Sequence, residues 1–64
     1  MRNYFVFVNY YLPNNSSPIE CGSILLTDYR DCVDAWETAT FCFGRHKEKC
    51  GYASFVITEF KEIK

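Results

Sequence analysis

The chain has 64 residues and a formal net charge of −1; 48% of its residues are hydrophobic and 19% are aromatic. This length predicts one small domain over residues 1–64, and the hydrophobic content excludes an intrinsically disordered chain. The near-zero charge argues against direct nucleic-acid binding, which needs a basic surface, and against an acidic mimic of DNA.

The first predicted element is a strand over Asn3–Leu12, where eight of ten residues are aromatic or aliphatic and none is charged. The run is too short to span a membrane, and its aromatic and β-branched residues favour a strand. Because polar residues do not alternate along it, we expect it at the centre of a sheet. Period-two alternation divides its side chains between two faces. One set is Tyr4, Val6, Val8 and Tyr10; the other is Phe5, Phe7, Asn9 and Tyr11.

A dense turn signal follows at residues 13–18, which contain both prolines of the chain together with asparagine and serine. Proline removes a backbone donor, and asparagine and serine form local hydrogen bonds, so the strand is expected to end here. The next stretch, Ile19–Thr27, reads as a second strand. The two strands are predicted to form an antiparallel hairpin with a long loop.

A helix is predicted to open at Thr27 or Asp28, either of which can cap the free amides of a first turn. Apolar residues then recur at three- and four-residue steps, as in an amphipathic helix that lies on a sheet. Gly44 is a natural left-handed cap, so the helix is expected to end near Phe43, with continuation toward Lys47 left open. The stripe predicted to be buried is Tyr29, Cys32, Val33, Trp36, Ala39, Thr40 and Phe43, with Trp36 as its central anchor.

The last element, Tyr52–Ile63, reads as a third strand whose end is more polar than its start. The chain is therefore expected to be an α+β protein of order β-β-α-β. Placing the most apolar strand in the centre gives a three-stranded antiparallel sheet of order 2-1-3, with one helix packed on one face. The other face of the sheet is left without a cover.

Candidate chemistry centres on Cys42, His46 and Cys50, which are spaced by four residues, with Cys21 and Cys32 as further thiols. The chain has no C-x-x-C pair, and Gly44 is expected to interrupt the helix that would align the three residues. We therefore predict reduced thiols, no bound metal, no cofactor and no catalytic residues. The acidic group Asp31, Asp34 and Glu37 is either a solvated helix face or a docking edge for a basic partner.

The uncovered sheet face is the predicted interaction surface, because large apolar patches are rare on monomers and aromatic residues are enriched in interfaces. Asn9 is the amide in the apolar strand, and a buried amide needs a hydrogen-bond partner, so the set that contains Asn9 is expected to face outward. The predicted partner-binding residues are Phe5, Phe7, Asn9, Tyr11 and, from the third strand, Phe55. The partner is either another protein or a second copy that forms a homodimer through this face.

The succession YFVFVNYYL, IECGSILLT, DYRDCVDAWETATF and SFVITEF resembles small proteins encoded by bacteriophages and prophages, including anti-CRISPR and other anti-defence inhibitors. The resemblance concerns the order of elements over nearly the whole chain and carries no site residue with it. It implies a non-enzymatic protein that binds and inhibits a host protein. Because no signal-peptide pattern is present, the expected location is the cytoplasm, of the host if the chain is phage-encoded. The alternatives are a structural or homo-oligomeric component of a virion or assembly, and a metal-stabilised module.

Overall fold

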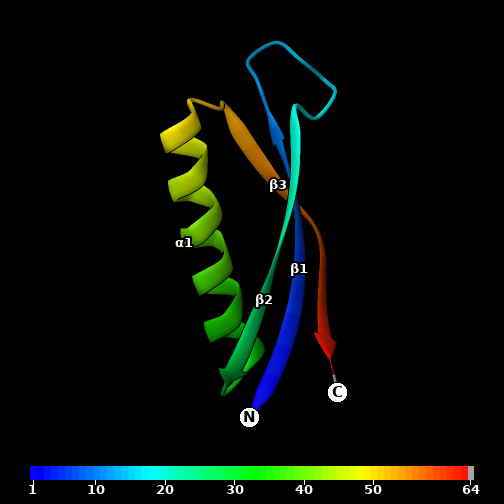
Figure 1. The fold of residues 1–64 in the computed structure, drawn as a ribbon, viewed down its shortest axis with the longest axis vertical. Helices are drawn as coiled ribbons and strands as arrows, with labels where there is room; N and C mark the ends of the chain where they lie inside the picture. The colour runs from blue at the N-terminus through cyan, green and yellow to red at the C-terminus, as the bar shows by residue number, and fades with distance from the viewer. Residues whose placement is uncertain (64) are drawn as a thin grey trace.

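The computed structural model describes residues 1–63, which form three strands and one helix (Figure 1). The order is β1 (Arg2–Tyr11), β2 (Glu20–Tyr29), α1 (Cys32–Cys50) and β3 (Ser54–Ile63). Both outer strands pair antiparallel to β1, which gives the sheet order β2-β1-β3. The predicted α+β class, the β-β-α-β order and the central position of the apolar strand are confirmed.

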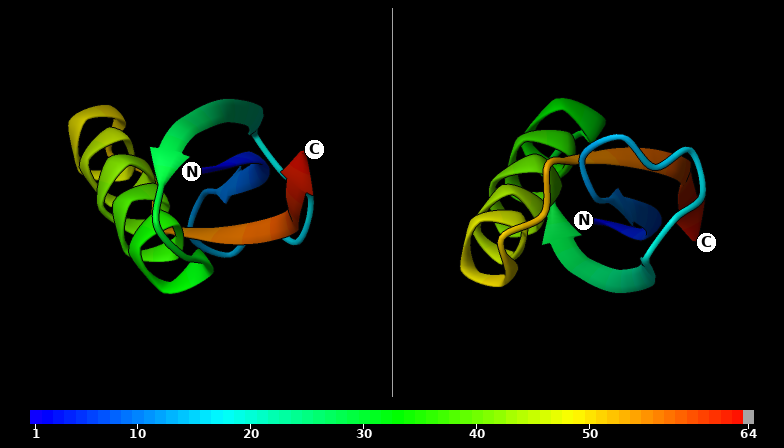
Figure 2. Two further views of the ribbon diagram at one scale, coloured as in Figure 1. Left: turned by 90° about the horizontal axis from the view of Figure 1, so that it is seen from below. Right: turned by 90° about the horizontal axis from the view of Figure 1, so that it is seen from above.

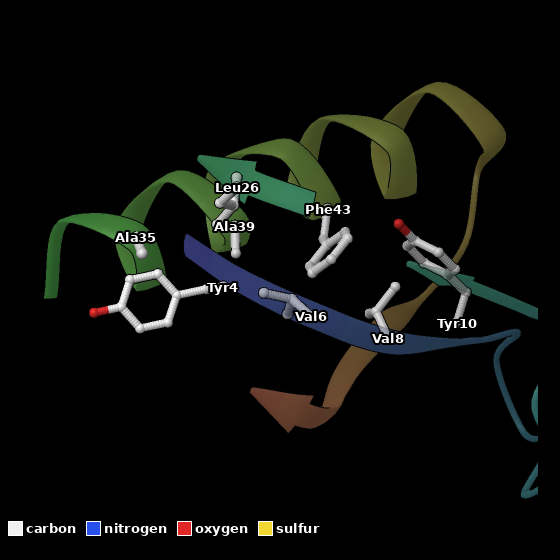
Figure 3. Packing of buried hydrophobic residues seen from close by; sticks show 8 residues of the cluster. All are labelled: Tyr4, Val6, Val8, Tyr10, Leu26, Ala35, Ala39 and Phe43. Carbon is white, nitrogen blue, oxygen red and sulfur yellow. The ribbon is translucent and has the colours of Figure 1, made fainter. Parts of the chain in front are cut away.

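The core lies between α1 and the sheet, and β1 supplies half of its buried side chains (Figure 3). From β1 it takes the set that lacks Asn9, and from α1 it takes two alanines and one phenylalanine. Ala35 and Ala39 are fully buried, so the helix can approach β1 closely while the strand's tyrosines supply the volume. The buried residues are Tyr4, Val6, Val8, Tyr10, Leu26, Ala35, Ala39 and Phe43.

α1 begins several residues later than the sequence predicts. β2 continues through Thr27 and Asp28 to Tyr29, with Asp28 in the left-handed region at φ 66° and its amide donating to Asn3 Oδ1 at 3.1 Å. The N-cap is Asp31, whose side chain accepts a hydrogen bond from the Asp34 amide at 3.0 Å. Thus Asp31 satisfies a free amide of the first turn, which is a structural role for part of the acidic group.

The end of α1 also differs from the prediction, because Gly44 lies inside the helix rather than after it. The helix continues to Cys50 and is capped by Gly51, which adopts the left-handed conformation at φ 74°. The Tyr52 amide then donates to the Lys47 carbonyl at 2.9 Å, as in a glycine-terminated helix end. Lys47 and Lys49 occupy the last turn, where the helix dipole favours positive charge.

Trp36 is not the buried anchor that its place in the predicted stripe suggested. It is 45% exposed and contacts Phe60 from the flank of the helix. The side of α1 that faces β1 is instead the line Ala35, Ala39 and Phe43, at steps of four residues. The prediction was wrong because it gave the largest side chain the central position, whereas the close approach of helix and strand leaves room there only for alanine.

The pairing of β1 with β3 contains a register shift that determines which β3 side chains face the helix. Phe7 pairs with Glu59 and the next residue, Val8, pairs with Ile57, so Thr58 is an extra residue in β3. Such a bulge reverses the alternation of side chains on either side of it. Phe55 and Phe60, which simple alternation would send to opposite faces, therefore both pack against the core.

The molecule is long and narrow, with extents of 40 × 18 × 14 Å. Seen along its long axis, the sheet is strongly twisted and α1 lies on one side of it (Figure 2). One face of β1 is consequently left without a helix. No helix within residues 1–63 combines the length and the apolar content that crossing a membrane requires.

Candidate binding face

The sheet face opposite α1 is the strongest candidate for a binding site, and we call it the outer face. Phe5, Phe7, Asn9 and Tyr11 of β1 point to this face, because the alternate residues of the strand are buried under the helix. The alternation and the position of Asn9 therefore predicted correctly which side of β1 faces away from the core. Neighbouring strands add Leu25 and Cys21 from β2 and Val56 from β3, which pair with outward residues of β1.

The centre of the outer face is apolar and accessible. The rings of Phe5 and Phe7 lie 4.9 Å apart and are tilted by 33°. Leu25, which pairs with Phe5, is 58% exposed, and Val56, which pairs with Asn9, is 52% exposed. Phe7 itself is 41% exposed. Burial of such side chains against another surface removes apolar area from water and favours association.

Two hollows lie at opposite ends of the outer face. One, of about 390 Å³, is lined by Phe5, Phe7, Ile63 and the charged residues Glu59, Lys61 and Glu62. The other, of about 650 Å³, is formed by Tyr11, Val56 and the loop after β1, including Pro13–Ser16. The face therefore presents a contoured surface with an aromatic centre and a charged rim on β3. This combination of an apolar centre and a polar rim is typical of protein interfaces.

Phe55, which the sequence assigned to the binding residues, does not lie on the outer face. Its ring contacts Tyr10, with centroids 6.4 Å apart, and Phe43, with centroids 6.1 Å apart, both on the helix side. The extra residue Thr58 explains the error, since it lets Phe55 and Phe60 share one face. Val56 takes the outward position in its place.

A second candidate is a polar cluster between the start of β2 and the end of α1. The Tyr52 hydroxyl donates to Glu20 Oε1 at 2.5 Å, and His46 Nε2 lies 2.9 Å from Glu20 Oε2. The Cys50 Sγ lies 3.5 Å from the same His46 nitrogen. Sequence analysis found His46 and Cys50 from their helical spacing but missed Glu20 and Tyr52, because these come from elements distant in the sequence.

Hydrogen bonding in this cluster shifts two ionisation equilibria. The Tyr52 hydroxyl and His46 lower the pKa of the Glu20 carboxyl, since both interact favourably with its charged form. The same contact with Glu20 raises the pKa of Tyr52 to about 12. Charge-assisted hydrogen bonds in the cluster thus link the end of α1 to β2.

The geometry of the cluster differs from that of a nucleophilic triad. In such a triad the base contacts the nucleophile through one ring nitrogen and the orienting carboxylate through the other. Here Cys50 and Glu20 both come closest to Nε2 of His46. The helix does align Cys42, His46 and Cys50, contrary to the expected interruption at Gly44. Even so, no group of three His, Cys, Asp or Glu side chains within residues 1–63 is arranged to hold a metal ion.

The four cysteines are unpaired and exposed. In comparisons with known proteins, no protein-family model, no curated protein and no solved structure matches the chain.

Proposed function

We propose that this protein is a non-enzymatic binding protein that holds another protein on its outer face. The observation that carries the proposal is the exposed aromatic pair Phe5 and Phe7, with Leu25 and Val56 beside it, on the sheet face that α1 does not cover. Aromatic residues that cluster at the centre of a contact surface supply most of the binding energy in protein complexes.

The partner that the resemblance to anti-defence proteins implies is a host protein that is inhibited by the complex. The proposed mechanism is occlusion: the protein occupies a surface that the target needs, in a one-to-one complex, without chemical change to either chain. The proposed location is the cytoplasm of the host, where four exposed, unpaired thiols are compatible with the reducing conditions. A structural component that assembles through the same face is the alternative function.

The test is site-specific photo-crosslinking. A photoreactive phenylalanine analogue at Phe7 should capture one defined host protein, whereas the same analogue at Phe41, which is 65% exposed on α1, should not. Titration of the captured target's activity should reach full inhibition at equimolar protein.

Substitutions at the outer face separate loss of binding from loss of folding. Phe7→Lys and Leu25→Lys should retain the far-ultraviolet circular dichroism of the wild type and abolish binding, because both side chains are substantially exposed. Phe41→Lys is the matched control and should bind normally. If both outer-face variants are folded and still bind, the proposed face is wrong. If the analogue at Phe7 captures a second copy of the chain and no host protein, the assembly alternative replaces inhibition.

A further inference from the structure

β3 is an edge strand with an open side. Within residues 1–63 only β1 pairs with it, so its backbone donors and acceptors on the other side have no strand partner. An open edge of this kind can add a further strand, whose backbone supplies hydrogen bonds and whose alternate side chains select the partner.

The second half of β3 has a hollow on each side of the sheet. On the helix side, a hollow of about 290 Å³ is lined by Cys32, Val33, Trp36 and Phe60. On the other side is the hollow of about 390 Å³ that contains Phe5 and Phe7. A strand added beside β3 would direct successive side chains toward these two hollows in turn. The edge is therefore shaped for an extended segment rather than for a flat surface.

The charges on this edge are complementary to those of β3 from a second chain that runs antiparallel to it. Glu59 and Lys61 pair with Phe7 and Phe5 and so share the outer side, while Phe60 between them packs toward the helix. We infer that a second copy of the chain pairs with β3 of the first in antiparallel orientation, about a two-fold axis at Phe60. This arrangement sets Glu59 of each copy opposite Lys61 of the other, and opposite charges in directly facing positions stabilise a strand pair.

Neighbouring registers lack this complementarity. A two-fold axis at Glu59 would place two carboxylates opposite each other, and an axis at Lys61 would place two ammonium groups opposite each other. Like charges in facing positions are destabilising. The Phe60 register also brings the two Phe60 rings side by side on the helix face, where they can add to the apolar contact.

The exposed side chains at the flank of α1 support the same arrangement. In the six-stranded sheet of the dimer, the two β1 strands lie about 14 Å apart, three strand spacings of about 4.8 Å. Two helices in direct contact have axes about 8–10 Å apart. The helices packed over the two β1 strands are further apart than this, so a gap separates them. The gap lies above Phe60 and beside Trp36 and Val33, which are 45% and 60% exposed in the single chain. These large apolar side chains can fill the gap between the two helices.

Features of β3 also make pairing with unrelated strands unfavourable. The bulge at Thr58 and the charges at Glu59 and Lys61 are devices that protect edge strands from indiscriminate association. Only a strand with the opposite order of charges satisfies both positions, and the antiparallel copy provides that order. The dimer contacts each outer face only at its β3 rim, so the rest of that face, with Leu25 and Val56, remains accessible to the proposed partner.

Charge reversal tests the inference by sedimentation equilibrium. Glu59→Lys and Lys61→Glu should each weaken the dimer about tenfold or more, because two attractive pairs become repulsive. An equimolar mixture of the two variants should form a heterodimer, and the double variant Glu59→Lys/Lys61→Glu should dimerise like the wild type. Glu48→Lys and Lys49→Glu, exposed positions near the end of α1, make the same changes in net charge and should leave dimerisation unchanged.

Two results would overturn the inference: a wild-type chain that remains monomeric at about 1 mM, where even a weak complex of millimolar Kd is populated, and single charge reversals that dimerise as tightly as the wild type. Thermal unfolding of each variant shows whether it is folded, and the mixing experiment gives a gain of association that an unfolded variant cannot produce. Leu25→Lys should abolish partner binding while it preserves the dimer, which separates failure of this inference from failure of the proposed function.

Discussion

The ring of Trp36 meets the ring of Phe60 edge-on, with 5.4 Å between their centroids, and so joins the flank of α1 to the edge of the sheet. Almost half of Trp36 remains accessible to water. We therefore predict that Trp36→Ala folds and loses about 1–2 kcal/mol of stability, less than the ~3–5 kcal/mol typical of a buried tryptophan. Urea denaturation monitored by circular dichroism measures this loss. An unfolded Trp36→Ala variant would show that the flank contact contributes as much as a buried core residue.

The buried alanines of α1 should tolerate substitution less well than Trp36. Ala39 is fully buried against β1, and a larger side chain there would push the helix off the strand. Ala39→Leu is expected to lose about 1–3 kcal/mol or more through overpacking. Val33→Leu, at an exposed position of the same helix, is the control and should change stability by less than about 0.5 kcal/mol. A stabilised Ala39→Leu variant would show that the helix–sheet interface has unfilled space.

Substitution by alanine should have opposite effects on stability at Gly44 and at Gly51. Gly44 lies inside α1, and an added Cβ would meet Phe55 at an ordinary distance of 4.0 Å. Gly44→Ala is expected to stabilise the protein by about 0.5–1 kcal/mol, because alanine is the better helix former. Gly51 has φ 74°, so Gly51→Ala should destabilise by about 1 kcal/mol. Paired urea titrations check both signs, and equal effects would place the helix end elsewhere.

The contact between Glu20 and Tyr52 predicts a stability that falls at both extremes of pH. The lowered pKa of Glu20 stabilises the fold above its usual value of 4.5, and this contribution is lost as the pH falls through the folded-state pKa. The raised pKa of Tyr52 stabilises the fold below pH 10, and this contribution is lost between pH 10 and about 12. Melting temperatures of the wild type should therefore decline in both ranges.

Variants of the pair distinguish this contact from general denaturation. Tyr52→Phe should flatten the alkaline decline and reduce the acid decline, because the tyrosine hydroxyl is the largest cause of the shift at Glu20. Glu20→Gln should flatten the acid decline, while Glu48→Gln, which changes an exposed residue of α1, should follow the wild type. Identical pH profiles for all four proteins would rule out a contribution from the contact.

The state of the cysteines is also open to direct measurement. All four are exposed and unpaired, so protein purified without reductant under nitrogen should titrate with four thiols and contain no stoichiometric zinc. Thiol titration and elemental analysis check the two parts of this prediction. Fewer than four thiols would indicate a disulfide, and one equivalent of zinc would favour the metal-stabilised alternative.

The sequence was sufficient to predict the order of elements and the side of β1 that faces away from the helix. Both follow from local composition, because an uncharged aromatic strand is expected at the centre of the sheet and the amide of Asn9 marks its accessible side. The placement of Asn9 on the outer face agrees with that reasoning. Local composition does not encode the shape of another molecule, so it predicts an accessible face and not what binds there.

The features that the sequence did not predict depend on fit between distant elements. The rotation of α1 that buries Ala35 in place of Trp36 depends on how closely the helix approaches β1. The contact of Glu20 with Tyr52 joins residues that are 32 positions apart. Helical periodicity shows that a face is apolar, but it does not show which line of that face is in contact when small and large side chains lie side by side.

The extra residue in β3 makes Thr58 a position where the chain can change in length as well as in side chain. Thr58 is exposed, so most substitutions there should leave the protein folded. Its deletion should also be tolerated, because Phe55 and Phe60 would then be four positions apart and regular alternation alone would place both on the helix side. Comparison of sequences related to this one should then show many residue types and also gaps at this site, and a library that contains both substitutions and deletions would give the same result by selection for folded protein.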